Sequence, residues 1–153
     1  MNGLKKVSLG IVLLTLLTLT ACSGTKNYNY KMKNSSTDGS VVLTVKGDKV
    51  IKYSTNIEIR SYSKSNLQTL QYIRYHSRDA LAKMYYDSLK GAKYKIDYNE
   101  SKKIVNIKLD IDLTKADMQQ LYQKRILTDK EVKYISLKDA EKLLSKQGYQ
   151  MVK

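Results

Sequence analysis

The chain has 153 residues, of which 42% are hydrophobic and 27% charged. This balance is typical of one folded domain and excludes a wholly disordered chain. The formal net charge of +14 is compatible with a nucleic acid, an anionic membrane or an acidic wall polymer as partner, and equally with a lysine-rich surface that only confers solubility. A single cysteine excludes an intramolecular disulfide.

The first 21 residues have the organisation of an export signal. Lys5 and Lys6 precede an uncharged, mostly apolar run over residues 7–20. A helix needs about 20 apolar residues to span the hydrocarbon of a bilayer, so this run is too short for a stable transmembrane anchor. Its length and its basic start are those of a signal peptide. The leader contains no acidic residue and only two of the 28 basic ones, so the remaining chain keeps a net charge of +12.

The leader ends in Leu19-Thr20-Ala21-Cys22, which resembles the lipobox of bacterial lipoproteins. This resemblance implies that diacylglycerol alkylates the thiol of Cys22 and that a peptidase cuts between Ala21 and Cys22. Two acyl chains hold a protein stably on a membrane. We therefore expect a lipid-anchored protein on the extracytoplasmic face of the cell membrane. The alternatives are an ordinary secretory signal, or a buried apolar helix that contains a cysteine by chance.

The lipidated N-terminus and a short polar tether are predicted over residues 22–27, and one domain over 28–153. Apolar and polar residues alternate in 28–32, in 41–45 and in 51–60, which predicts three antiparallel strands in a meander. Gly47-Asp48 joins the last two strands and suits a type II′ hairpin. The following side chains of the third strand are expected on one face: Ile51, Tyr53, Thr55, Ile57 and Ile59.

A long amphipathic helix is predicted over residues 65–90, where apolar side chains recur at spacings of three to five. Ser65 or Asn66 is the expected N-cap, and Gly91 the residue that follows the last turn. The apolar stripe weakens beside His76, where the helix could be interrupted.

The rest of the chain predicts a hairpin and further helices. Residues 94–98 and 105–111 alternate as strands do. Thr114 is the expected cap of a short helix that contains Leu121, and Ser136 with Asp139 forms a capping box for another. Gly148 is expected to stop that helix, and a short strand is expected over 149–152. The predicted fold class is α+β, an antiparallel sheet (meander plus hairpin) packed by two or three α-helices.

Several short stretches resemble, in order and spacing, the YehR-like bacterial lipoproteins. These stretches are Gly47-Asp48-Lys49-Val50, Tyr94-Lys95-Ile96-Asp97-Tyr98, Lys115-Ala116-Asp117, Ile135-Ser136-Leu137 and Lys146-Gln147-Gly148-Tyr149. The resemblance covers nearly all of the chain after the leader and implies a small, lipid-anchored α+β domain. That family has no known function, so the resemblance implies no catalytic residues and transfers only the lipid-attachment role of Cys22.

The sequence offers little catalytic chemistry, and we expect neither an enzyme nor a cofactor. The one histidine, His76, has no cysteine partner for a metal site and is interpreted as a helix-surface residue. Asp110 and Asp112 share one face of a strand and, with Asp97 or Glu100, could bind a cation. Such pairs are more often the solvated face of an amphipathic strand.

Basic residues are the remaining functional signal. Five lysines of the predicted hairpin are candidate contacts for anionic lipid or for an acidic cell-wall polymer: Lys93, Lys95, Lys102, Lys103 and Lys108. A nucleic-acid partner is not expected, because the tyrosines follow the core period and do not interleave with the basic residues. We therefore expect a non-enzymatic binding or envelope-interaction module. The alternatives are an accessory subunit of a membrane transporter or enzyme complex, docking through its sheet face, and a small-ligand or cation binder; no protein partner is identified.

Overall fold

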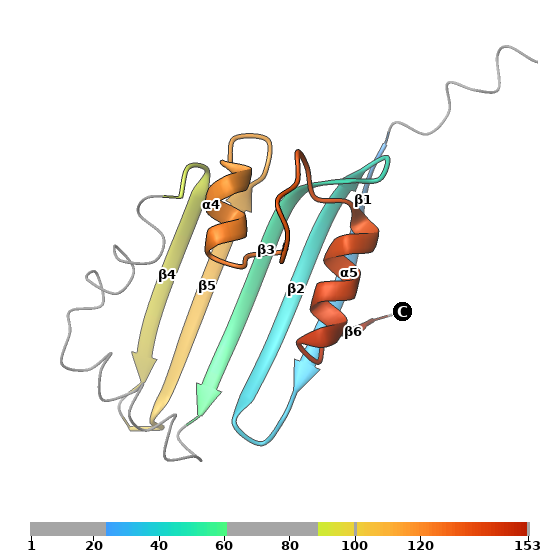
Figure 1. Ribbon diagram of the computed structural model, residues 1–153. Coiled ribbons are helices and arrows are strands. Elements are labelled where there is room, and N and C mark those ends of the chain that lie inside the picture. The colour runs from blue at the N-terminus through green and yellow to red at the C-terminus, as the bar shows by residue number, and fades with distance from the viewer. Residues whose placement is uncertain (1–23, 61–88, 100, 153) are drawn as a thin grey trace, which may run out of the picture.

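The computed structural model describes residues 24–60, 89–99 and 101–152, which form one six-stranded sheet with two helices (Figure 1). The predictions for the leader, for Cys22 and for the helix over 65–90 lie outside these residues. The strands are β1 (Thr25–Lys33), β2 (Thr37–Lys46), β3 (Lys49–Arg60), β4 (Ala92–Asn99), β5 (Ile104–Asp112) and β6 (Gln150–Met151).

The sheet is antiparallel throughout, with the strand order β4-β5-β3-β2-β1-β6. The meander β1–β2–β3 is confirmed, and so is the hairpin β4–β5, which joins the sheet through β5 against β3. A type II′ turn requires a positive φ at its first central residue and not at its second. Between β2 and β3, Gly47 has a φ of +64° and Asp48 is not in the left-handed region, as this turn requires. β1, β3 and β4 begin at the end of the sheet that is uppermost in Figure 1, which we call the upper end; the opposite end is the lower end.

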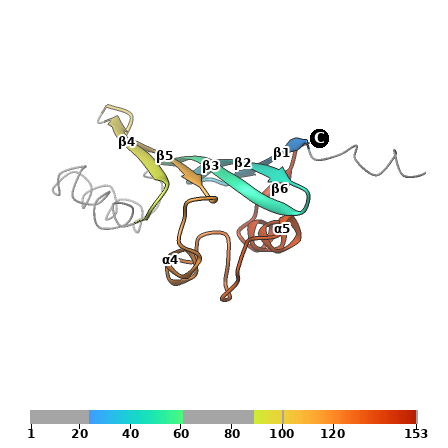
Figure 2. The ribbon, with the colours of Figure 1, turned by 90° about the horizontal axis from the view of Figure 1, so that it is seen from above.

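Both helices of the described chain, α4 (Met118–Gln123) and α5 (Leu137–Lys146), pack on the same face of the sheet (Figure 2). In the described part of the chain the other face, here the open face, carries no helix. The structure thus confirms the α+β class, with two helices among the described residues; a third was predicted only over 65–90.

The core lies between the sheet and these helices. Alternate residues of the strands point toward the helices, as their period of two predicts. The most deeply buried side chains come from β2, β5, α4, α5 and the segment before α5: Val41, Leu43, Val45, Ile111, Leu121, Ile135 and Leu144. A smaller apolar cluster surrounds Val105 at the lower end of β5.

β1 starts earlier than the sequence pattern indicates. Thr25 pairs with Lys46, and Asn27 pairs with Thr44 both through the backbone register and by accepting a hydrogen bond from the Thr44 hydroxyl. Three of the five residues expected in the tether therefore belong to the sheet. Polar strand residues at an exposed edge lack the alternation that marks a buried face, so the pattern alone placed the boundary too late.

The common face predicted for the third strand is wrong at Ile51. The register between β2 and β3 shifts at Thr44 and Val45, so Val45 pairs with Val50 while Thr44 pairs with Lys52. The bulged residue Ile51 is left without a partner on β2, and Val50 enters the core in its place. A bulge inverts the alternation locally.

The helix caps are partly as predicted. Ser136 caps α5, and its Oγ accepts a hydrogen bond from the Asp139 backbone amide at 3.1 Å. Gly148, at a φ of +87°, follows the last turn of α5. The prediction that Thr114 caps α4 is wrong, because Asp117 accepts hydrogen bonds from the Gln119 and Gln120 amides. The Thr114 hydroxyl instead donates to Asp112.

Candidate functional site

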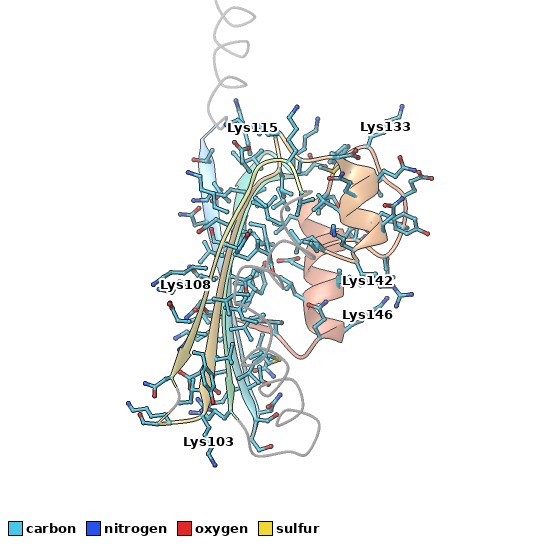
Figure 3. All side chains as sticks on the ribbon, turned by 90° about the vertical axis from the view of Figure 1, so that its left-hand side faces the viewer. Lys103, Lys108, Lys115, Lys133, Lys142 and Lys146 are labelled. Carbon is cyan, nitrogen blue, oxygen red and sulfur yellow. The ribbon has the colours of Figure 1, made fainter. Side chains whose placement is uncertain are left out.

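The five candidate lysines lie on one hairpin but do not form one patch. Lys93 and Lys95 are on β4 and Lys108 on β5, whereas Lys102 and Lys103 are in the turn that joins these strands. In Figure 3, Lys103 projects from the lower end of the sheet, and Lys108 projects from the open face, away from the helices. The hairpin therefore spreads its positive charge along the full length of the sheet.

Carboxylates accompany the lysines of the open face. Lys95 Nζ lies 2.9 Å from Asp97 Oδ2, and Lys52 Nζ lies 3.8 Å from Asp110 Oδ1. Lys93 is directly opposite Asp110 across the β4–β5 register. Exposed pairs of this kind contribute little to stability, but they reduce the local positive field. The open face is therefore mixed in charge.

The strand carboxylates that could bind a cation are already hydrogen-bonded to the protein. The Ser54 hydroxyl donates to Asp110, and Thr114 donates to Asp112 through its hydroxyl and its amide. The Thr114 hydroxyl, followed by Lys115, lowers the pKa of Asp112 from its ordinary value. Glu100 is outside the described residues, and among those described no three His, Cys, Asp or Glu side chains are grouped to hold a metal ion.

An open depression of about 690 Å³ lies near the upper end of the sheet, beside the bulge. Its lining includes Lys52, Lys93 and Lys115 together with Asp110 and Asp112. Both signs of charge are present, and Ile51 and Ala92 contribute apolar surface. The depression is wide and shallow, unlike the enclosed, mostly apolar pockets that hold small ligands.

A second cavity, of about 350 Å³, lies between the sheet and the segment that follows α4. Arg125 and Leu127 line it, and both have positive φ, at 53° and 58°. These values are unusual for non-glycine residues and mark a backbone held in place by its surroundings. Leu127 is buried in the core, and this packing accounts for the position of its backbone.

The upper end of the sheet carries a cluster that no sequence pattern singled out. The Tyr134 hydroxyl donates to Asp48 Oδ2 at 3.2 Å, and Lys49 Nζ lies 4.7 Å from the centroid of the Tyr134 ring. The hydrogen bond to Asp48 raises the pKa of Tyr134. Tyr134 remains 43% exposed and is one of the few large aromatic side chains that face solvent in the described chain.

Several lysines surround this cluster. Thr25 pairs with Lys46, which places the first residues of β1 beside the β2–β3 turn. Figure 3 shows Lys115 and Lys133 at this same end. The exposed lysines of the upper end, from five separate segments, are Lys26, Lys46, Lys49, Lys90, Lys115 and Lys133. Residues so far apart in the sequence give no local signal, which is why sequence reasoning missed them.

The described chain is thus a small α+β domain with a lysine-rich surface. A family model described as "Protein of unknown function (DUF1307)" matches residues 24–150, and the chain belongs to this family. The helices of the described residues include none that is both long and apolar enough to cross a membrane.

The comparisons with individual proteins agree with this assignment. The chain is 26% identical over 144 residues to "Uncharacterized lipoprotein Lin0239" of Listeria innocua, covering 92% of this chain and 91% of that protein. The NMR structure of the E. coli YehR protein matches with a TM-score of 0.62 at 18% identity, over 86% of this chain and 93% of that one. An NMR structure of a protein from Streptococcus pneumoniae TIGR4 matches with a TM-score of 0.53 at 14% identity, over 84% and 86%.

These likenesses confirm the predicted resemblance to the YehR-like lipoproteins. At such identities the two solved structures establish the shared fold, and the name of the Listeria protein describes that relative as a lipoprotein.

Proposed function

We propose that this protein is a lipoprotein, held on the extracytoplasmic face of the cell membrane by diacylglycerol on Cys22, and that it acts as a non-enzymatic binding or envelope-interaction module. The observation that carries this proposal is the segment Leu19-Thr20-Ala21-Cys22, directly after a basic, apolar leader. The lipoprotein name of the Listeria relative supports it.

The start of β1 supports an anchor at this position. Gly24 is the first described residue and Thr25 already belongs to the sheet, so the folded domain starts three residues after Cys22. At about 3.4 Å per residue, an extended chain of this length reaches roughly 10 Å. A lipid on Cys22 would therefore hold the domain against the headgroups, and two acyl chains would retain it there.

The hydrogen bonds made by the strand carboxylates support a binding role. The carboxylates of β5 are engaged by neighbouring side chains, Asp110 by Ser54 and Asp112 by Thr114 and Lys115, and both lie in the open depression at the upper end of the sheet.

Metabolic labelling with palmitate tests the anchor. We expect the wild-type protein to incorporate the label and to remain with the membrane fraction, and Cys22→Ala to do neither. Ser23→Ala is the matched control, because it changes the adjacent residue and keeps the thiol. Equal labelling of wild type and Cys22→Ala, or a mature chain that begins with an unmodified cysteine in mass spectrometry, would contradict the proposal.

The open face of the sheet favours a second candidate function, that of an accessory subunit of a membrane complex. Among the described residues no helix covers this face, which displays Lys31, Asn56 and Lys108 to solvent. A photo-crosslinking residue at Asn56, on the open face, should then capture one protein partner in cells. The same residue at Lys142, on α5, is the control; equal or absent capture at both positions would exclude this role.

A further inference from the structure

We propose that the upper end of the sheet is a membrane-contact surface for anionic phospholipid headgroups, so that the sheet stands end-on to the bilayer. This inference rests on the proposed anchor at Cys22. It adds the orientation of the domain and the residues that touch the lipid. The surface consists of Tyr134 and the six lysines of the upper end: Lys26, Lys46, Lys49, Lys90, Lys115 and Lys133.

The position of the chain entry fixes which end is near the lipid. Gly24 and Thr25 lie at the upper end, because Thr25 pairs with Lys46 at the β2–β3 turn. Cys22 is two residues before Gly24, which limits their Cα separation to about 7 Å. This distance is below the screening length of about 8 Å at physiological ionic strength. Charges at the upper end would therefore lie within the electrostatic field of the headgroups.

Three carboxylates of the upper end are engaged within the protein, whereas Glu131, two residues before Lys133, is exposed and makes no ion pair with a described residue. Asp48 accepts from Tyr134, Asp112 accepts from Thr114 and pairs with Lys115, and Asp117 caps α4. The lysines of the upper end are less often engaged by other residues of the protein. Within the described part of the chain, five of them make no ion pair: Lys26, Lys46, Lys49, Lys90 and Lys133. Glu131 offsets one of these charges, and the upper end keeps a net positive charge on the side of the anchor.

Tyr134 is an independent observation at the same end. Its ring is 43% exposed, its hydroxyl is hydrogen-bonded to Asp48, and Lys49 lies against one face of the ring. Tyrosine is enriched at the membrane–water interface because its ring prefers the apolar side and its hydroxyl the wet side. An exposed tyrosine between lysines suits the headgroup layer better than it suits bulk water.

In the end-on orientation, the lower end lies away from the lipid contact. β5 has nine residues and separates the Lys102–Lys103 turn from the upper end. At about 3.3 Å per residue, this is a separation of roughly 30 Å, several screening lengths. Lys102 and Lys103, although basic and exposed, would project away from the bilayer (Figure 3).

Distance measurements on the acylated protein in vesicles test the orientation. Cys22 is the only cysteine, and acylation blocks it, so a cysteine introduced elsewhere takes a fluorophore uniquely. We expect a fluorophore at Lys133→Cys to transfer energy strongly to labelled headgroups, and one at Lys103→Cys to transfer weakly. Equal transfer at both, or stronger transfer from residue 103, would overturn the end-on orientation. Mass spectrometry of the same samples reports acylation, so a failure of the anchor is seen separately.

Charge reversal tests the role of the lysines. With the fluorophore at residue 133, we expect transfer to be greater in vesicles that contain phosphatidylglycerol than in neutral phosphatidylcholine vesicles, and to fall with added salt. Each lysine near an anionic surface favours contact by about five-fold. The double variant Lys46→Glu, Lys90→Glu should therefore shift the equilibrium between contact and no contact by at least about 25-fold toward no contact, and energy transfer should no longer depend on lipid charge. Lys102→Glu with Lys103→Glu, the matched control, should leave that dependence unchanged.

Two results would overturn the lipid contact. One is transfer that does not depend on lipid charge in the wild type. The other concerns the Lys46→Glu, Lys90→Glu variant. If this variant no longer binds isolated wall polymer but keeps the wild-type level of energy transfer in anionic vesicles, the surface binds the cell wall and not the lipid.

Discussion

The ring of Tyr149 occupies the space that a side chain at residue 39 would fill. A Cβ atom placed on Gly39 would lie 2.5 Å from the Tyr149 hydroxyl oxygen and 3.0 Å from its ring carbon Cζ. Tyr149 follows α5 and is only 8% exposed, while Gly39 is in the interior of β2. Glycine normally weakens a strand, but here it lets the C-terminal segment close over the sheet.

Gly39→Ala should therefore destabilise the protein by about 1–3 kcal/mol, because the added methyl group forces the Tyr149 ring or the strand to move. Urea denaturation followed by far-UV circular dichroism measures the effect. Gly24→Ala is the control, since a Cβ there has no atom within 4 Å. Equal midpoints for Gly39→Ala and wild type would show that the ring moves freely.

The N-cap of α5 makes a second prediction. The Ser136 hydroxyl satisfies the Asp139 amide, and Ser136→Ala removes this acceptor. We expect a loss of about 1 kcal/mol of unfolding free energy, the usual cost of an N-cap serine. Ser145→Ala, at an exposed position in the same helix, should be neutral or slightly stabilising. If both substitutions behave alike in denaturant, Ser136 does not act as a cap.

A third prediction concerns acid stability. A hydrogen bond from Lys130, and then one from Ser136, lowers the pKa of Asp139. A carboxyl whose pKa is lower when folded stabilises the protein above its unfolded value of about 3.9, and this contribution disappears as the pH falls through the folded value. Asp139→Asn should thus be less stable than wild type at pH 7, and the difference should narrow below about pH 4. Denaturant titrations at pH 7 and at pH 3 check this; a constant difference would exclude the linkage.

The two faces of β2 give a fourth prediction. Leu43 is fully buried at 0% exposure, whereas its neighbour Val42 points to the open face. Leu43→Ala should cost about 2–5 kcal/mol, because it removes buried methyl groups and leaves a cavity. Val42→Ala should cost much less. Similar losses at both positions in thermal or urea unfolding would contradict the assignment of the faces.

The period-two alternation predicted most of the sheet, because a strand with one buried face must alternate. It predicted β2, β5 and the inward side of β3 from Tyr53 to Ile59. The alternation failed at two places where strand pairing, and not burial, decides the structure. One is the polar first residues of β1, and the other is Ile51, which the bulge displaces from the core face.

Local chemistry predicted α5 better than α4. The Ser136–Asp139 capping box precedes a regular apolar stripe, and both signals indicate the same start. Before α4, two capping residues compete three positions apart, Thr114 and Asp117, and the hydrogen bond of Thr114 to Asp112 decides between them. The upper-end surface was not predictable, since it assembles lysines from five segments that are brought together only by the sheet register and by the pairing of the segment before α5 with the start of β3.

The outermost strand, β4, has β5 on one side and no strand beyond it in the described chain. Unsatisfied strand edges invite pairing between molecules, and confinement to a membrane plane would bring copies together repeatedly. Lys93 and Lys95 stand along this border. Lysine is one of the residues by which natural edge strands resist pairing between molecules, so the same lysines that made the hairpin resemble a binding site can keep densely packed copies from polymerising.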